Sequence, residues 1–156
     1  MFLMSVDLRR ALGSIITLIG VIGVVAPISL AAAELALENP RIRELIPGQN
    51  QTVAYFDITN EGTVKVSLVG FASDSAGIIE IHTIVRDRDM VRMEQLSEVV
   101  LPPGKTIRFR TGGLHLMLLE VMDLREETEI QLLTSDGDIH RAIFQRVSLS
   151  DSLENE

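Results

Sequence analysis

Two metal-binding side chains stand close together in residues 112–118, which read Gly-Gly-Leu-His-Leu-Met-Leu. His115 and Met117 are two positions apart in an apolar stretch that favours a β-strand. Successive strand side chains alternate between faces, so these two share a face, with Cα atoms roughly 6–7 Å apart. Their imidazole nitrogen and thioether sulfur can then converge on one metal ion, although most such pairs in strands belong to a core.

A second histidine and methionine strengthen the metal interpretation. His82 precedes and Met93 follows the charged residues 86–89, which we expect to form a hairpin tip. Ten residues separate His82 from Met93, and twenty-one separate Met93 from His115. The four side chains offer two imidazoles and two thioethers, with no carboxylate and no thiolate. Because thioether sulfur is soft and is never protonated, this set suits Cu(I) rather than Mg²⁺, Ca²⁺ or Zn²⁺.

Composition limits the remaining function classes. The chain has 156 residues, no cysteine, no tryptophan and a formal charge of −8. This length suits one domain. Without cysteine there is no disulfide and no thiolate site. The negative charge argues against nucleic acid, whose phosphates need a positive partner.

The first 33 residues have the order of a secretory signal. Arg9 and Arg10 precede the uncharged residues 11–33, which end in three alanines before Glu34. Cleavage after Ala33 would remove a net charge of +1 and leave residues 34–156 at −9. The uncharged run is also long enough to span a bilayer, so a retained membrane anchor is the alternative. Both interpretations place the domain outside the cytoplasm.

Short strand-like segments follow at regular spacing, which predicts an all-β, antiparallel sandwich or barrel of eight or nine strands. Ala54, Phe56 and Ile58 should share one face, and residues 123–128 should form a single helical turn. We expect the domain to span residues 34–147 and residues 148–156 to form an acidic, flexible tail. The expected strands cover residues 53–59, 64–71, 78–85, 90–94, 99–101, 107–110, 114–121, 130–134 and 139–147.

The spacing of the four candidate ligands resembles the signature of the PCu(A)C periplasmic copper chaperones. Their surroundings are similar too: residues 79–82 (Ile-Glu-Ile-His), 90–93 (Met-Val-Arg-Met), 101–104 (Leu-Pro-Pro-Gly) and 112–118. The resemblance implies a cupredoxin-like, Greek-key β-sandwich that binds one Cu(I) through His82, Met93, His115 and Met117. It also implies delivery of copper, directly or through a thioredoxin-like assembly factor, toward the Cu(A) centre of cytochrome c oxidase. Residues 151–156 lack the histidines and methionines with which some members bind extra copper.

Other candidate residues are weaker. His140 lies in a polar hairpin and reads as a solvated side chain, Met90 should point away from Met93, and Met122 reads as core. No grouping of serine, histidine and acid and no phosphate-binding glycine loop indicates an enzyme. Two alternatives to a chaperone stay open. One is periplasmic copper buffering or tolerance through the same four residues, and the other is a β-sandwich interaction module that binds no metal.

Overall fold

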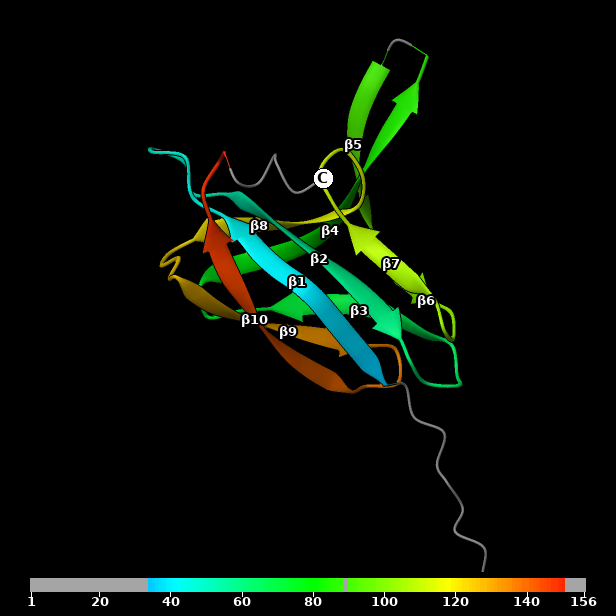
Figure 1. Ribbon diagram of the computed structural model, residues 1–156. Helices are drawn as coiled ribbons and strands as arrows, with labels where there is room; N and C mark the ends of the chain where they lie inside the picture. The colour runs from blue at the N-terminus through cyan, green and yellow to red at the C-terminus, as the bar shows by residue number, and fades with distance from the viewer. Residues whose placement is uncertain (1–33, 89, 151–156) are drawn as a thin grey trace, which may run out of the picture.

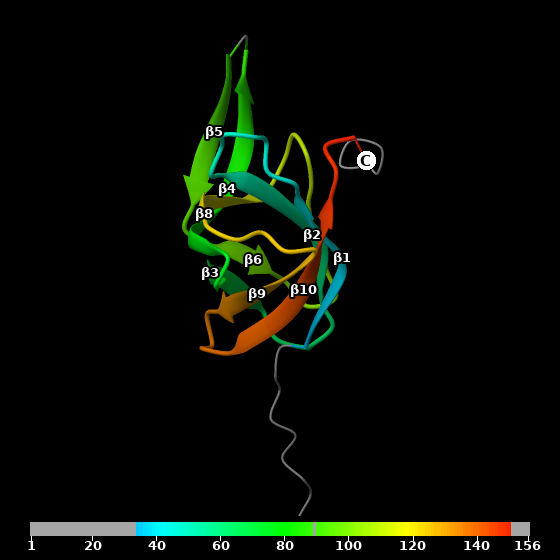
Figure 2. The same ribbon diagram turned by 90° about the vertical axis from the view of Figure 1, so that its left-hand side faces the viewer.

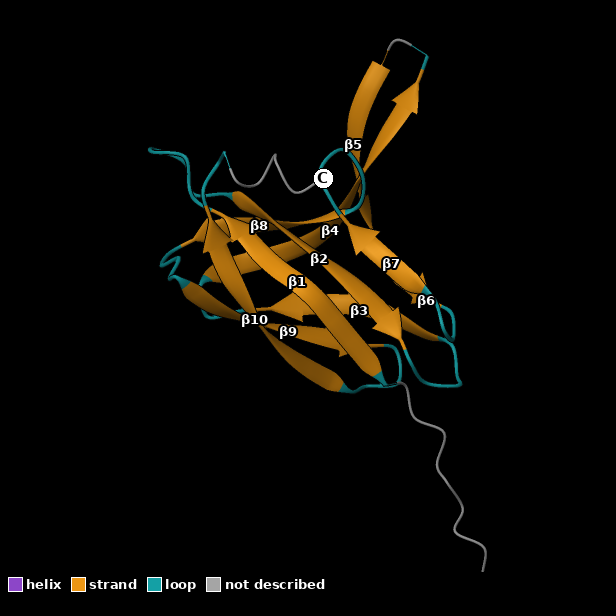
Figure 3. Ribbon diagram, in the orientation of Figure 1, coloured by secondary structure: helices purple, strands orange, loops and turns teal. Residues whose placement is uncertain are grey.

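The computed structural model describes residues 34–88 and 90–150, which form ten β-strands (Figures 1 and 3). None of these described residues is helical, so no helix among them is long and apolar enough to cross a membrane. The expected signal or anchor segment, residues 1–33, and the end of the acidic tail lie outside the described residues. The strands are β1 (Leu35–Arg43), β2 (Thr52–Asn60), β3 (Val66–Ala72), β4 (Ala76–Asp87), β5 (Met90–Leu96), β6 (Val99–Leu101), β7 (Thr106–Phe109), β8 (His115–Val121), β9 (Glu127–Thr134) and β10 (Ile139–Val147).

The strands follow one hydrogen-bonded path, β5-β4-β8-β2-β1-β10-β9-β3-β6, with β7 paired to β2. This path folds back on itself, and buried side chains from β2, β4 and β8 meet those from β3, β9 and β10. The predicted β-sandwich is therefore confirmed (Figure 2). One detail of the expectation is wrong, because β1 and β10 run parallel while the other strand pairs of the described chain are antiparallel.

The core lies between the two layers and is centred on three phenylalanines. Phe56 stacks on Phe109 with ring centroids 4.2 Å apart, and it meets Phe144 edge-on at 5.5 Å. Ala54 and Ile58 join Phe56 on the inward face of β2, as their alternation predicts. Large side chains on inward positions supply most of the hydrophobic stabilisation.

β1 was not expected as a strand, because Asn39 and Pro40 interrupt its alternation. The register with β2 shifts between Glu38 and Arg41, and Asn39 has a positive φ of 51°. This β-bulge absorbs the residues that cannot continue the ladder. β1 thereby fills the space between β2 and β10 and brings Arg43 to the sheet face that carries the candidate site.

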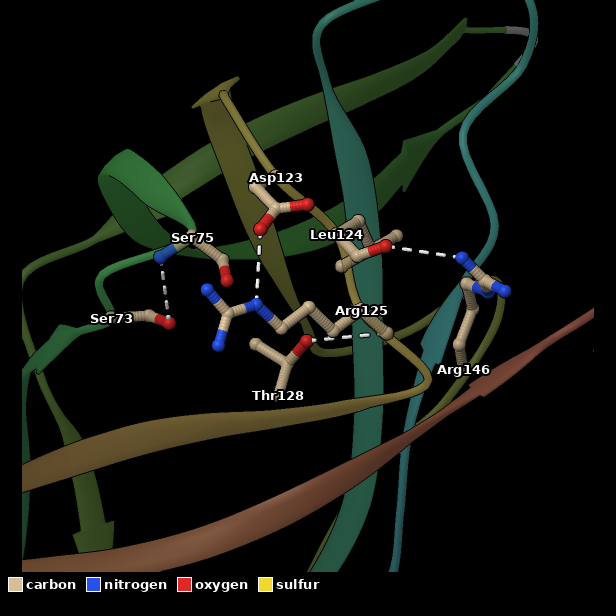
Figure 4. A network of polar contacts seen from close by, with 7 residues as sticks. All are labelled: Ser73, Ser75, Asp123, Leu124, Arg125, Thr128 and Arg146. Atoms are coloured by element: carbon tan, nitrogen blue, oxygen red, sulfur yellow. Dashed lines mark hydrogen bonds and ion pairs between the residues drawn. The ribbon is translucent and has the colours of Figure 1, made fainter.

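The helical turn expected at residues 123–128 does not form. The connection between β8 and β9 is irregular, and its backbone is held from outside, since Arg146 donates a 3.1 Å hydrogen bond to the carbonyl of Leu124 (Figure 4). Thr128 Oγ1 donates to the carbonyl of Arg125, and Arg125 pairs with Asp123 (Figure 4). With Leu124 buried in the core and its carbonyl already bonded, this segment has a stable alternative to a helical turn.

The β4–β5 hairpin extends beyond the body of the sandwich (Figures 1 and 2). β4 continues through Asp87. Arg86 and Asp87 therefore belong to the strand, and the expectation that they form part of the hairpin tip is wrong. At its base the hairpin continues directly into the β4–β8 pairing. It is therefore the element that carries Met93 and holds it close to His82 and His115.

Candidate metal centre

His82 and His115 are direct partners in the antiparallel pair formed by β4 and β8. Their imidazole rings lie edge-to-face, with centroids 5.9 Å apart and planes at 88°. Residues that oppose each other across two strands point to the same face. Segments thirty-three positions apart in the chain thus present two imidazoles to one small volume.

The two methionines approach from either side of this histidine pair. Met93 lies on β5, and its Sδ is 3.0 Å from Nδ1 of His82. Met117 follows His115 by two positions on β8, so it shares the face of His115. Met93, His115 and Met117 line the same cavity, whose volume is about 370 Å³. The structure therefore brings the four predicted residues together on one face.

Hydrogen bonds select which nitrogen of each ring is free. The carboxylate of Glu80 lies 3.0 Å from Nε2 of His82, and a carboxylate only accepts, so Nε2–H is the donor. Nδ1 of neutral His82 then directs its lone pair toward Met93. In His115 the bond runs to a carbonyl, because Nδ1–H donates to the oxygen of Gly113 at 3.0 Å. The free nitrogen of His115 is consequently Nε2, so the two rings differ in the atom each offers to a metal.

The two ends of the site differ in exposure. His115 is only 4% exposed, whereas Met93 is 47% exposed on the hairpin. Burial lowers the pKa of His115 below its ordinary value of 6.5. The Gly113 hydrogen bond acts in the opposite direction, and electrostatic repulsion from His82, when that ring is protonated, and from Arg43 lowers the pKa further. A neutral imidazole is the form that binds a metal, so this environment favours His115 as a ligand.

The site occupies the outward face of the sheet. On β8, His115 and Met117 alternate with the core residues Leu116 and Leu118, and on β2 Val53 and Tyr55 alternate with core residues in the same way. Packing that holds the core together therefore also fixes the backbone under the site. The side chains of the site therefore do not have to hold this part of the backbone in place.

The other sequence candidates lie elsewhere. Met90 is exposed and on the opposite face from Met93, as expected. Met122 is 75% exposed, so its expected place in the core is wrong. The expectation of a solvated His140 also needs correction, because this ring is partly buried on the inward side of β10 and its Nε2 has no hydrogen-bond partner among the described residues. Within that described part, no three or more His, Cys, Asp or Glu side chains form a metal site.

Three residues around the site were missed in the sequence. Glu80 stands two positions before His82, and this spacing was a usable signal that the two side chains share a face. Arg43 and Arg86 line the cavity beside His115. Arg43 comes from β1, seventy-two positions away from His115, so only the sheet order reveals its proximity.

This all-β architecture is that of the PCuAC domains, which confirms the predicted resemblance. The copper-bound PCuAC domain from PmoF2 aligns with a TM-score of 0.64 and 16% identity over 75% of this chain and 96% of that domain. The solution structure of CuI-DR1885 from Deinococcus radiodurans gives a TM-score of 0.61 and 22% identity over 76% of this chain and 80% of that one. At these identities the likeness establishes the fold.

Residues 35–132, more than half of the chain, match the family described as "Putative lipoprotein LpqE-like", and the chain belongs to this family. "Putative lipoprotein Lxx21020" of Leifsonia xyli is 28% identical over 112 residues, which cover 69% of this chain and 68% of that protein. The "Uncharacterized protein RP573" of Rickettsia prowazekii is 29% identical over 107 residues, covering 65% of this chain and 59% of that protein.

Proposed function

We propose that this protein binds one Cu(I) ion as cargo through His82, Met93, His115 and Met117. The observation that carries the proposal is the cross-strand pair His82–His115, with Met93 Sδ already 3.0 Å from Nδ1 of His82. Copper–ligand bonds are short, so donor atoms that share one ion must lie within a few ångströms of one another. Two of these structural neighbours are described as copper-bound and Cu(I)-bound, which agrees with the proposal.

The donor set favours a carrier over a catalyst. Two neutral imidazoles and two thioethers hold a soft monovalent ion without adding charge, and an imidazole whose lone pair binds the ion is not free to act as a base or nucleophile toward a substrate. Met93 is half exposed on a projecting hairpin, so a partner's ligand reaches the ion from that side. We infer that the protein delivers its Cu(I) ion to a copper-accepting protein. The specific destination that we propose is the Cu(A) site of cytochrome c oxidase.

We further propose that the protein works outside the cytoplasm, in the periplasm. The order of charged, apolar and small residues in 1–33 supports export, by cleavage after Ala33 or by a retained anchor. The lipoprotein name of the family and of its Leifsonia xyli relative agrees with a membrane-associated location. The copper-binding domain would then span residues 34–147, followed by the acidic tail 148–156.

Competitive Cu(I) titration under anaerobic conditions tests the proposal. We expect one Cu(I) per chain, and loss of that binding in His115→Ala. Met122→Leu is the matched control, because Met122 is an exposed methionine just beyond β8 and outside the site. Binding of copper by His115→Ala as tightly as by the unmodified chain would reject the site. Transfer of the bound ion to an acceptor protein separates a chaperone from a protein that only buffers copper.

A further inference from the structure

The cavity beside the candidate ligands differs in charge from the chain as a whole. The whole chain carries −8, yet the residues that line this cavity include two arginines and no carboxylate. The remaining lining is mainly apolar, and Val91 on the hairpin is 66% exposed. This combination of an apolar wall and a positive rim is the usual complement of an acidic protein surface.

Arg43, which lines this cavity, has one hydrogen-bond donor without a partner among the described residues. This donor is Nε, which is buried. This Nε is shielded from solvent, so an acceptor from outside the chain would meet the part of the Arg43 side chain that lines the cavity. Guanidinium groups pair best with carboxylates, often through two parallel hydrogen bonds.

Arg86, on β4, also lines the cavity. One of its nitrogens, Nη1, donates a 3.2 Å hydrogen bond to the carbonyl of Gly112, which connects the hairpin to the loop before His115. A guanidinium has five N–H donors, so this bond leaves others for a second acceptor. Arg43 and Arg86 thus place two positive charges in the lining of the cavity that also contains His115 and Met117.

We propose that this cavity is the docking surface for an acidic segment of the copper-accepting protein, whose carboxylates are bound by Arg43 and Arg86. The inference rests on the proposed copper-carrier function. Attraction between opposite charges speeds the encounter and orients the partner, so that its copper ligands arrive beside Met93. A positive charge close to the bound ion also opposes copper retention, so Arg43 should promote transfer at the expense of affinity.

Two synthetic peptides with the same Cys-x-x-x-Cys copper site test the proposal, one flanked by aspartate and glutamate and the other by an equal number of lysines. The donor is the full 156-residue chain, loaded with Cu(I) in a non-ionic detergent. We expect stopped-flow transfer to the acidic peptide to be at least about 10-fold faster at low salt, with the difference shrinking as salt is added.

The variants R43Q and R86Q should each slow transfer to the acidic peptide several-fold and leave transfer to the lysine peptide unchanged or faster. R43Q should bind Cu(I) at least as tightly as the unmodified chain. R141Q removes an equal charge from β10, where Arg141 pairs with Glu129, and should behave like the unmodified chain. Equal rates for the two peptides, or an equal loss in R141Q, would overturn the proposal.

Docking is also measurable without copper, which keeps its failure distinct from failure of the copper site. An acidic peptide with serines in place of both cysteines should shift the backbone amide signals of Arg43, Arg86, Val91 and Gly112 in the copper-free chain. The R43Q/R86Q double variant should abolish those shifts. Absence of shifts in the unmodified chain would refute the docking surface, even if the protein binds Cu(I).

Discussion

His82 and His115 face each other across β4 and β8, with their rings 5.9 Å apart and nearly perpendicular. Each ring has one nitrogen engaged by a neighbouring oxygen, from Glu80 in one case and from Gly113 in the other. The remaining nitrogens are the donors that this pair offers to a metal. The site is therefore ordered by hydrogen bonds before any ion arrives, which reduces the reorganisation that binding requires.

Met117→Leu should preserve the fold and lose most of the affinity for Cu(I). The substitution roughly conserves volume, so we expect the free energy of unfolding to change by less than about 1.5 kcal/mol. The lost thioether removes one of four donors, and competition against a Cu(I) chelator should show an affinity at least about 10-fold lower. Unchanged affinity in a folded Met117→Leu protein would exclude this methionine from the site.

The protein should prefer Cu(I), or its mimic Ag(I), to Zn²⁺. Thioether sulfurs bind soft monovalent ions well and contribute little to Zn²⁺, which would retain only the two imidazoles. Parallel titrations of the unmodified chain provide the comparison. A lower dissociation constant for Zn²⁺ than for Cu(I) would contradict the assignment of Met93 and Met117 as ligands.

Nitrogen-15 NMR should find opposite tautomers in the copper-free protein, with the proton on Nε2 in His82 and on Nδ1 in His115. Removing the acceptor in Glu80→Ala should leave His82 as a mixture of tautomers and reduce Cu(I) affinity by about 10–100-fold, the usual effect of losing such a hydrogen-bonding partner. Glu129→Ala, on the distant strand β9, is the control and should change neither property. The same tautomer in both rings would contradict the assignment.

Acidification should weaken copper binding, because protons compete for the ligating nitrogens. Metal binding depresses the pKa of each ligating histidine, so the affinity is highest above the pKa of the copper-free ring and falls below it. Burial has already lowered the pKa of His115 from 6.5, so this ring should resist protonation to a lower pH than an exposed histidine. Up to two protons should be taken up as copper leaves. Chelator competition from about pH 5 to 8 tests this expectation.

The same shift predicts how the copper-free fold responds to pH. Between the lowered pKa of His115 and its unfolded value near 6.5, the unfolded chain binds more protons than the folded chain. Stability from this residue is therefore present above pH 6.5 and is lost as the pH falls toward the folded pKa. Urea unfolding at several pH values should show a smaller decline for His115→Gln. An equal decline in both proteins would mean that other groups cause the acid sensitivity.

Phe56→Ala should destabilise the domain by about 3–5 kcal/mol, because it removes the ring that stacks on Phe109 and contacts Phe144. Met93→Leu, a volume-conserving change on the exposed hairpin, is the matched comparison and should cost far less. Urea unfolding of both variants measures the difference. A small loss in Phe56→Ala would mean that the core can close around the missing ring.

The sequence predicted most of the architecture because β2, β4, β8 and β10 combine alternating or apolar runs with clear turn residues. It failed where local pattern and tertiary context disagree. β1 could not be recognised from the sequence, because Asn39 and Pro40 break its alternation. A bulge accommodates these two residues only when the neighbouring strands are in place. Met122 reads as apolar and therefore buried, yet it follows the last residue of β8 and points into solvent.

For the candidate site, spacing within strands identified the histidines and methionines, but not the residues that surround them. His115 and Met117 could be assigned to one face from their separation alone. The approach of Arg43 to His115 depends on β1 lying beside β2 and β2 beside β8, an order that no local pattern encodes. The exact cross-strand register of His82 and His115 has the same origin, since it is set by pairing over a long sequence distance.

The course of β1 gives the domain a direction. Its last residue, Arg43, lines the cavity beside His115, while β1 begins at the far end of the sandwich from the β4–β5 hairpin (Figures 1 and 2). Eight steps of about 3.3 Å set an upper limit of roughly 26 Å on the distance from Leu35 to Arg43, because the bulge at Asn39 shortens the strand. The described chain therefore starts, at Glu34, at the end of the domain that is remote from this cavity. A partner that docks at the cavity would stand clear of Glu34 by about the length of β1.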